Sequence, residues 1–189
     1  MKKNLLIKLN DIIVDISTQY DKSIKKSIEF FLGRLIDVNE IEEFRRKICP
    51  VNNTECINKF INEQGLFLRD VAIIKKFNEY YTGREFEGYI KDTDFLIDKT
   101  TLKKISDNKS ISLLLVMPKE EADFILKELK INNLKTITAK TIEEGIKKAK
   151  ESLKEFAYIG NTDFDKDAAK KQEIDFIKIE KIKDIKDLL

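Results

Sequence analysis

The chain has 189 residues, of which 42% are hydrophobic and 37% are charged, a composition typical of a globular protein with one domain or with a core and one insertion. Its 36 basic and 34 acidic residues leave a net charge of +2, so charge gives no reason to expect nucleic acid or a membrane as a partner. Histidine is absent, which excludes the commonest general base and the commonest metal ligand.

Cysteine usage and hydropathy exclude two further classes. Two cysteines, Cys49 and Cys56, are too few for a four-ligand zinc site, so we expect two reduced, half-buried thiols. No apolar run is long enough to span a membrane, and the short apolar stretch near the N-terminus is interrupted by Lys8, which is not the pattern of a signal peptide. We therefore expect a cytoplasmic protein.

The first predicted element is a short buried strand at residues 5–9, followed by further apolar residues up to Ile16. From Ser17, an expected N-cap, the spacing of apolar residues becomes helical. Four helical patterns follow, marked by Tyr20, Ile24, Ile28, Phe31 and Leu35, by Ile41, Phe44 and Ile48, by Ile57, Phe60 and Ile61, and by Val71, Ile74, Phe77 and Tyr81. Residues 17 to about 90 are thus expected to be almost entirely helical.

The remaining chain alternates between strands and helices. Strands are predicted at residues 113–116, 134–137, 156–159 and 174–179, each followed by a helical pattern. This alternation predicts right-handed βαβ units and a parallel sheet, which the first strand must join because it has no other partner. The expected fold class is therefore α/β, with a Rossmann-like core at 1–16 and 95–189, an inserted all-helical domain at 17–94, and a hinge at residues 92–94.

Polar residues follow the predicted strands at their carboxyl ends, where a parallel sheet places its functional groups. The first strand runs into Lys8-Leu9-Asn10-Asp11-Ile12-Ile13-Val14-Asp15. The strand at 156–159 runs into Gly160-Asn161-Thr162-Asp163-Phe164-Asp165-Lys166-Asp167-Ala168-Ala169. We expect these two segments to meet at one edge of the sheet.

Both segments resemble motifs of the haloacid dehalogenase (HAD) superfamily of phosphohydrolases, in the branch with a helical cap inserted after the first strand. The family's first motif is Asp-x-Asp-Gly-Thr followed by two hydrophobic residues and Asp, and residues 8–15 keep its frame. The fourth motif, Gly-Asp-Thr-x-x-Asp-x-x-Ala-Ala, matches residues 160–169 with one substitution and is the more specific signal. The resemblance covers essentially the whole chain.

The resemblance implies a role for each motif position. In the family the first aspartate attacks phosphorus, and the second is the general acid and base. Mg²⁺ is held by the first aspartate, a main-chain carbonyl and a fourth-motif aspartate. The nucleophile, the acid/base and the metal ligand are here Lys8, Asn10 and Asn161. The phosphate-binding hydroxyl of the second motif falls near Leu115, and Ser112 stands at the wrong end of that strand.

We therefore expect a degenerate member, a pseudoenzyme with no catalytic residue, no metal and no Mg²⁺ cofactor, because loss of a nucleophile alone costs on the order of 10⁶ in turnover. Two interpretations of Lys8 stay open. It pairs with Asp165 or Asp11 in a purely structural role, or it binds a phosphorylated small molecule. The candidate ligand-binding residues are Lys8, Asn10, Lys140, Asn161 and Asp165.

Two other functions are kept as alternatives. One is an active phosphatase on a small phosphorylated metabolite that uses Asp11, although Asp11 would point away from the site if the strand continued its alternation. Asp15 and Asp163 are the other acids expected near the site. The second is a protein-interaction or homodimerisation module built on the aromatic residues of the helical insertion, which more often form a core: Phe30, Phe31, Phe60, Phe67, Phe77, Tyr80 and Tyr81.

Overall fold

The computed structural model of the chain describes residues 4–48, 53–131 and 134–188. The chain forms two compact units. The core unit comprises the residues up to Asp15 together with those from Asp94 onward, and the helical unit is Ile16–Thr93. The expected role of the helical unit as a cap stays a prediction.

A five-stranded parallel sheet forms the centre of the core unit. Its strands are β1 (Asn4–Lys8), β4 (Ile111–Val116), β5 (Lys135–Ala139), β6 (Phe156–Gly160) and β7 (Asp175–Lys178). They lie in the order β5-β4-β1-β6-β7, so β1 is the central strand and pairs with β4 and β6. The prediction of a Rossmann-like parallel sheet that includes the first strand is confirmed.

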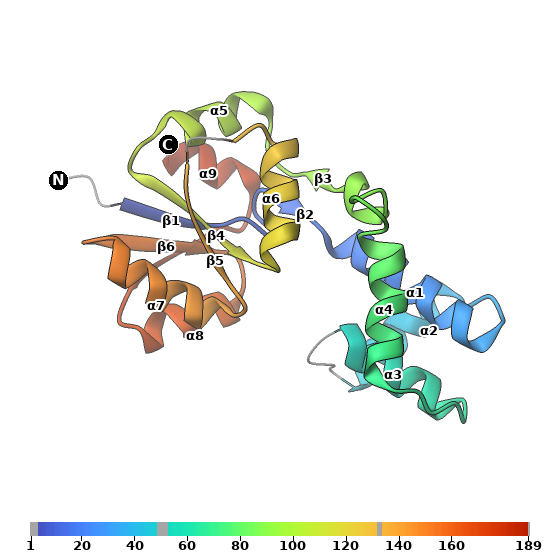
Figure 1. Cartoon of the computed structure of the whole chain (residues 1–189). Coiled ribbons are helices and arrows are strands. Elements are labelled where there is room, and N and C mark those ends of the chain that lie inside the picture. Colours follow the sequence, from blue (N-terminus) through green and yellow to red (C-terminus); the bar gives the residue numbers. More distant parts are fainter. Residues whose placement is uncertain (1–3, 49–52, 132–133, 189) are drawn as a thin grey trace. The chain divides into compact units, whose positions relative to one another are not determined.

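The core unit also contains five described helices: α5 (Lys99–Asp107), α6 (Lys119–Glu128), α7 (Ile142–Ser152), α8 (Asp163–Lys171) and α9 (Ile182–Leu188). Figure 1 shows α7 and α8 on one face of the sheet and α5 and α9 on the other. The sequence did not predict α5, because its nine residues hold only two large apolar side chains, Leu102 and Ile105. Asp98 begins this helix by accepting a hydrogen bond from the Thr101 N–H at 2.8 Å.

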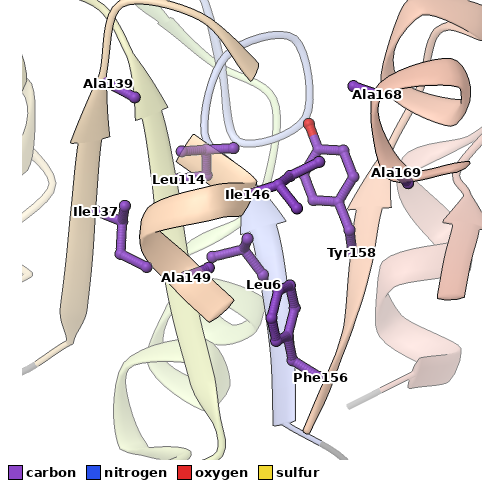
Figure 2. Packing of buried hydrophobic residues seen from close by; sticks show 10 residues of the cluster. All are labelled: Leu6, Leu114, Ile137, Ala139, Ile146, Ala149, Phe156, Tyr158, Ala168 and Ala169. Atoms are coloured by element: carbon purple, nitrogen blue, oxygen red, sulfur yellow. The ribbon is translucent and has the colours of Figure 1, made fainter. Parts of the chain in front are cut away.

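Buried side chains from the strands pack against α7 and α8 (Figure 2). Leu6, Leu114 and Tyr158 lie under Ile146 of α7 in one cluster. The helix approaches β4 closely because position 145 is glycine, and a methyl group there would overlap the Leu114 side chain. In Figure 2 the Tyr158 hydroxyl points toward the carboxyl-terminal edge of the sheet, the edge at which the predicted site residues lie.

The helical unit contains the four helices that the sequence periodicity predicts and one 3₁₀ turn: α1 (Ser17–Leu32), α2 (Val38–Ile48), α3 (Asn53–Glu63), α4 (Asp70–Tyr81) and η1 (Tyr89–Asp92). The predicted N-cap of α1 was wrong, since the cap is Ile16 and no side chain caps the helix. Across the described residues, no helix has both the length and the apolar character needed to cross a membrane.

Cys56 in α3 is fully buried, not half-buried as expected, and burial raises the pKa of its thiol to about 11. A thiol with this pKa stays protonated near neutral pH and is a poor nucleophile. The other cysteine, Cys49, lies outside the described residues.

Two short strands carry the chain out of the core unit and back into it. β2 (Val14–Asp15) pairs antiparallel with β3 (Asp94–Phe95), and the Leu96 N–H donates to the Ile13 carbonyl at 2.9 Å. Asp94, expected in the hinge, is therefore part of a strand pair. Two-residue strands carry no periodic signal, which is why the sequence did not predict them.

Candidate functional site

A tight turn follows β1 and ends the alternation of its side chains. The Ile13 and Val14 N–H groups both donate to the Leu9 carbonyl, at 2.9 and 3.1 Å, and Asp11 has a left-handed φ of 63°. Because the strand stops at Lys8, Asp11 does not point away as a continued strand would require. Its Oδ2 lies 3.2 Å from the Lys8 Nζ.

Lys8 is almost completely buried, with a relative exposure of 5%. Three oxygens surround its ammonium: Asp165 Oδ2 at 3.1 Å, Asn161 Oδ1 at 3.2 Å and Asp11 Oδ2 at 3.2 Å. An ammonium has three N–H donors and no acceptor, so these oxygens match its donors in number. The site therefore satisfies the lysine with groups from its own chain.

Asp165 is fully buried in the first turn of α8, where a capping box holds it. Its Oδ2 accepts from the Thr162 N–H at 2.9 Å and the Thr162 hydroxyl at 2.6 Å, and also from the Asn161 N–H at 3.2 Å. A Cβ on Gly160 would lie 2.5 Å from the Asp165 Cβ, so the last residue of β6 must lack a side chain for the carboxylate to reach this position.

Tyr158 satisfies the other carboxylate oxygen, because its hydroxyl donates to Asp165 Oδ1 at 2.6 Å. Burial raises the pKa of Tyr158, and the bond to the carboxylate raises it further, so the phenol stays neutral. Burial alone would raise the pKa of Asp165, but the hydrogen bonds from Thr162 and Tyr158 and the charge of Lys8 outweigh it and leave that pKa below its usual value. Asp165 is thus an ionised carboxylate beside the Lys8 ammonium.

The remaining candidates are placed differently. Asn161 links the two sides of the site, since its Nδ2 donates to the Asp11 carbonyl at 3.2 Å. Asn10 is buried, and its Oδ1 has no hydrogen-bond partner among the described residues. Lys140 follows β5, two strands away from β1, with an exposed side chain, and its backbone N–H donates to Glu144. Within the described structure, no hydrogen bond or ion pair joins Lys140 to Lys8 or Asp165.

Sequence reasoning missed two residues that shape the site, Tyr158 and Gly160. The signal for Tyr158 was a single hydroxyl-bearing residue in the otherwise apolar strand Phe156–Gly160. The signal for Gly160 was its place in the motif. The structure adds the reason for a glycine there, because a side chain would collide with Asp165. In β4, Leu115 is fully buried and Ser112 lies near the amino-terminal end, so no hydroxyl of that strand reaches the site.

No protein-family model and no curated protein matches the sequence. Solved structures do match. The phosphatase Tt82 from Thermococcus thioreducens gives a TM-score of 0.76 at 16% identity, over 93% of this chain and 92% of that one. A HAD-superfamily hydrolase of subfamily IA from Geobacter sulfurreducens gives 0.68 at 16% identity, over 99% and 96%. A haloacid dehalogenase-like family hydrolase from Streptococcus pneumoniae gives 0.58 at 16% identity, over 93% and 83%.

These likenesses show the fold. The chain has the α/β fold of HAD-superfamily hydrolases, as the two motifs predicted, and the likenesses extend over nearly its whole length.

Proposed function

We propose that this chain of HAD-like fold is a pseudophosphatase, a protein that keeps the fold without Mg²⁺-dependent phosphohydrolase activity and serves as a regulatory or ligand-binding protein. The observation that carries the proposal is the Lys8 ammonium at the end of the central strand, where the resemblance requires the attacking carboxylate. An ammonium has no lone pair with which to attack phosphorus, and its three donors already have acceptors.

The residues at this edge of the sheet do not fit Mg²⁺, the cofactor that the fold family implies. Mg²⁺ prefers an octahedron of oxygens with one or two carboxylates and several waters. The best-placed carboxylate, Asp165, is fully buried and is already bonded on both oxygens. A cation beside it would also face the charge of Lys8 within a few ångströms, where Coulomb repulsion is strong. We therefore assign no step to a metal.

The position that should hold the general acid and base is also unsuitable for catalysis. Asn10 stands where the resemblance expects the general acid and base, and a side-chain amide does not titrate in the working range. Asp165 is held ionised and out of solvent, so it is unavailable to attack a substrate. Among the described residues, Asp11 is the one exposed carboxylate within ion-pair distance of Lys8, and an active phosphatase would have to use it.

Hydrolysis of p-nitrophenyl phosphate with Mg²⁺ tests the proposal, with Asp11→Asn and Lys8→Ala measured in parallel. The expected result is the same background rate for the wild type and both variants. A wild-type rate well above background that disappears in Asp11→Asn would contradict the proposal and assign catalysis to Asp11.

One observation favours a second function, binding of a phosphorylated small molecule. Of the three acceptors on Lys8, Asp165 is fully buried and Asn161 is half-buried, whereas the Asp11 side chain is 44% exposed. A phosphate could replace the Asp11 carboxylate on the ammonium without disturbing the other two contacts. The ligand would then be held by a lysine point charge and the Asn161 amide.

Thermal unfolding with phosphorylated metabolites in the presence of EDTA tests this second function, because a ligand that binds only the folded state raises the midpoint. The expected shift is larger in Asp11→Asn, which lacks the competing carboxylate, and absent in Lys8→Ala. Lys140→Ala shows whether the distant lysine takes part. No shift with any of these ligands, or an equal shift in Lys8→Ala, would exclude binding at Lys8.

A further inference from the structure

A groove with a volume of about 460 Å³ lies in the core unit between β3, one face of α5 and the end of α6. It shares no residue with the Lys8 site. Residues 99, 102, 103 and 106 of α5 line it at helical spacing, and Leu129 and Ile131 close the opposite side. Its size falls within the range of small-molecule sites.

The lining of the groove is mainly apolar. Phe95 is 49% exposed although it belongs to β3, and Leu102 is half-buried beside it in the lining. Ile97, Leu129 and Ile131 complete the apolar surface. An aromatic ring of this size left half in water is a surface that gains free energy from being covered.

Three lysines stand around this apolar lining: Lys99, Lys103 and Lys130. Over the described ranges, none of the three lies within ion-pair distance of a carboxylate. The lining includes one acid, the exposed Glu128. Some other surface lysines of the core unit do have such partners, for example Lys148 with Glu144 at 2.7 Å and Lys186 with Asp98 at 2.6 Å. The lining of the groove thus carries more positive than negative charge.

We propose that this groove binds a small amphipathic anion, an apolar chain or ring that carries a single anionic head group. The apolar body covers Phe95 and Leu102, and the head group reaches the lysines at the rim. Lysine suits this role because its apolar stem packs along the lining while its ammonium remains at the surface. The inference is independent of the function proposed for Lys8.

Isothermal titration of the full chain with decanoate tests the proposal, with decanol and decyltrimethylammonium as probes of equal chain length. Decanoate is expected to bind with one site per chain, decanol more weakly, and the cation not at all. Lys103→Gln and Lys130→Gln are each expected to weaken decanoate binding by up to about fivefold, the strength of an exposed ion pair. Lys104→Gln is the matched control, because Lys104 is an exposed neighbour on α5 outside the groove.

The apolar part has its own variant and control. Phe95→Ala is expected to weaken binding of decanoate, whereas Phe164→Ala, which removes an 83% exposed ring from α8, is expected to leave it unchanged. Decanoate that does not bind, binds no better than decanol, or binds equally to the lysine variants would overturn the proposal. A dimer in light scattering that Phe95→Ala dissociates would instead assign the groove to contact between copies, and would overturn it as well.

Discussion

The Lys8 ammonium lies 3.1 Å from Oδ2 of Asp165, and both side chains are buried. The ion pair joins the carboxyl end of β1 to the first turn of α8, the helix that follows β6, and β1 and β6 are neighbouring strands of the sheet. A buried pair stabilises a fold only if both charges also find hydrogen bonds, and here the lysine has three oxygen neighbours and the carboxylate has donors on both oxygens. Removal of one partner should therefore destabilise the fold mainly because the other charge stays buried without a counter-charge.

Lys8→Met tests this directly, because the methionine side chain is unbranched and nearly as long as that of lysine but carries no charge. We expect the free energy of unfolding to fall by about 3 kcal/mol, since Asp165 would remain buried without its cation. Urea denaturation measures this. Lys178→Met is the matched control, because Lys178 ends β7 and pairs with the exposed Asp163, and it should change the free energy by less than about 0.5 kcal/mol. Equal losses in the two variants would mean that the buried Lys8–Asp165 pair contributes no more to the free energy of unfolding than an exposed pair does.

The depressed pKa of Asp165 predicts a loss of stability in acid. A carboxyl whose pKa is lower in the folded than in the unfolded chain stabilises the fold above the unfolded value of about 3.9, and that contribution is lost as the pH falls through the folded pKa. Below about pH 4 the free energy of unfolding should therefore decline more steeply in the wild type than in Asp165→Asn. Asp167→Asn, an exposed neighbour, should follow the wild-type curve, and parallel curves for wild type and Asp165→Asn would refute the assignment.

Tyr158→Phe removes the hydroxyl that donates to Asp165 Oδ1. We expect a loss of about 2 kcal/mol in the free energy of unfolding, because one oxygen of a buried carboxylate would be left without a donor. The pKa of Asp165 should also rise, which an NMR titration of the carboxyl would detect. Tyr80→Phe, at a half-buried position of α4, serves as the control. If Tyr158→Phe loses no more stability than this variant, the bond from Tyr158 to Asp165 contributes little.

Gly160→Ala tests whether the backbone of β6 must approach the carboxylate. The new methyl group would lie 2.5 Å from the Asp165 Cβ, so the first turn of α8 must move, and we expect a loss of about 2 kcal/mol. Gly33→Ala is a useful comparison, because its methyl group meets nothing within 4 Å and its cost is limited to the left-handed backbone, about 1 kcal/mol. Thermal unfolding of both variants separates crowding from backbone strain.

The sequence by itself determined the features that depend on near neighbours in the chain. The apolar spacing gave the strands and most of the helices, and their alternation gave the parallel sheet. The spacing of Thr162 and Asp165 is that of a capping box, which is complete within one turn of α8. The sequence did not predict short or weakly apolar elements such as β2, β3 and α5, because they hold too few apolar residues to show a period.

The sequence offered Asp165 or Asp11 as the partner of Lys8, and only the tertiary structure decided that both lie on it, together with Asn161. Its partner Asp165 is 157 positions away along the chain, and the contact exists because β1 and β6 pair in a register that brings their ends together. The turn at Asp11 and the closeness of Gly160 to Asp165 are local features, but neither leaves a periodic pattern in the sequence. A sequence states which charges a chain holds, but the distance between two of them depends on strand order, register and packing, which no local pattern encodes.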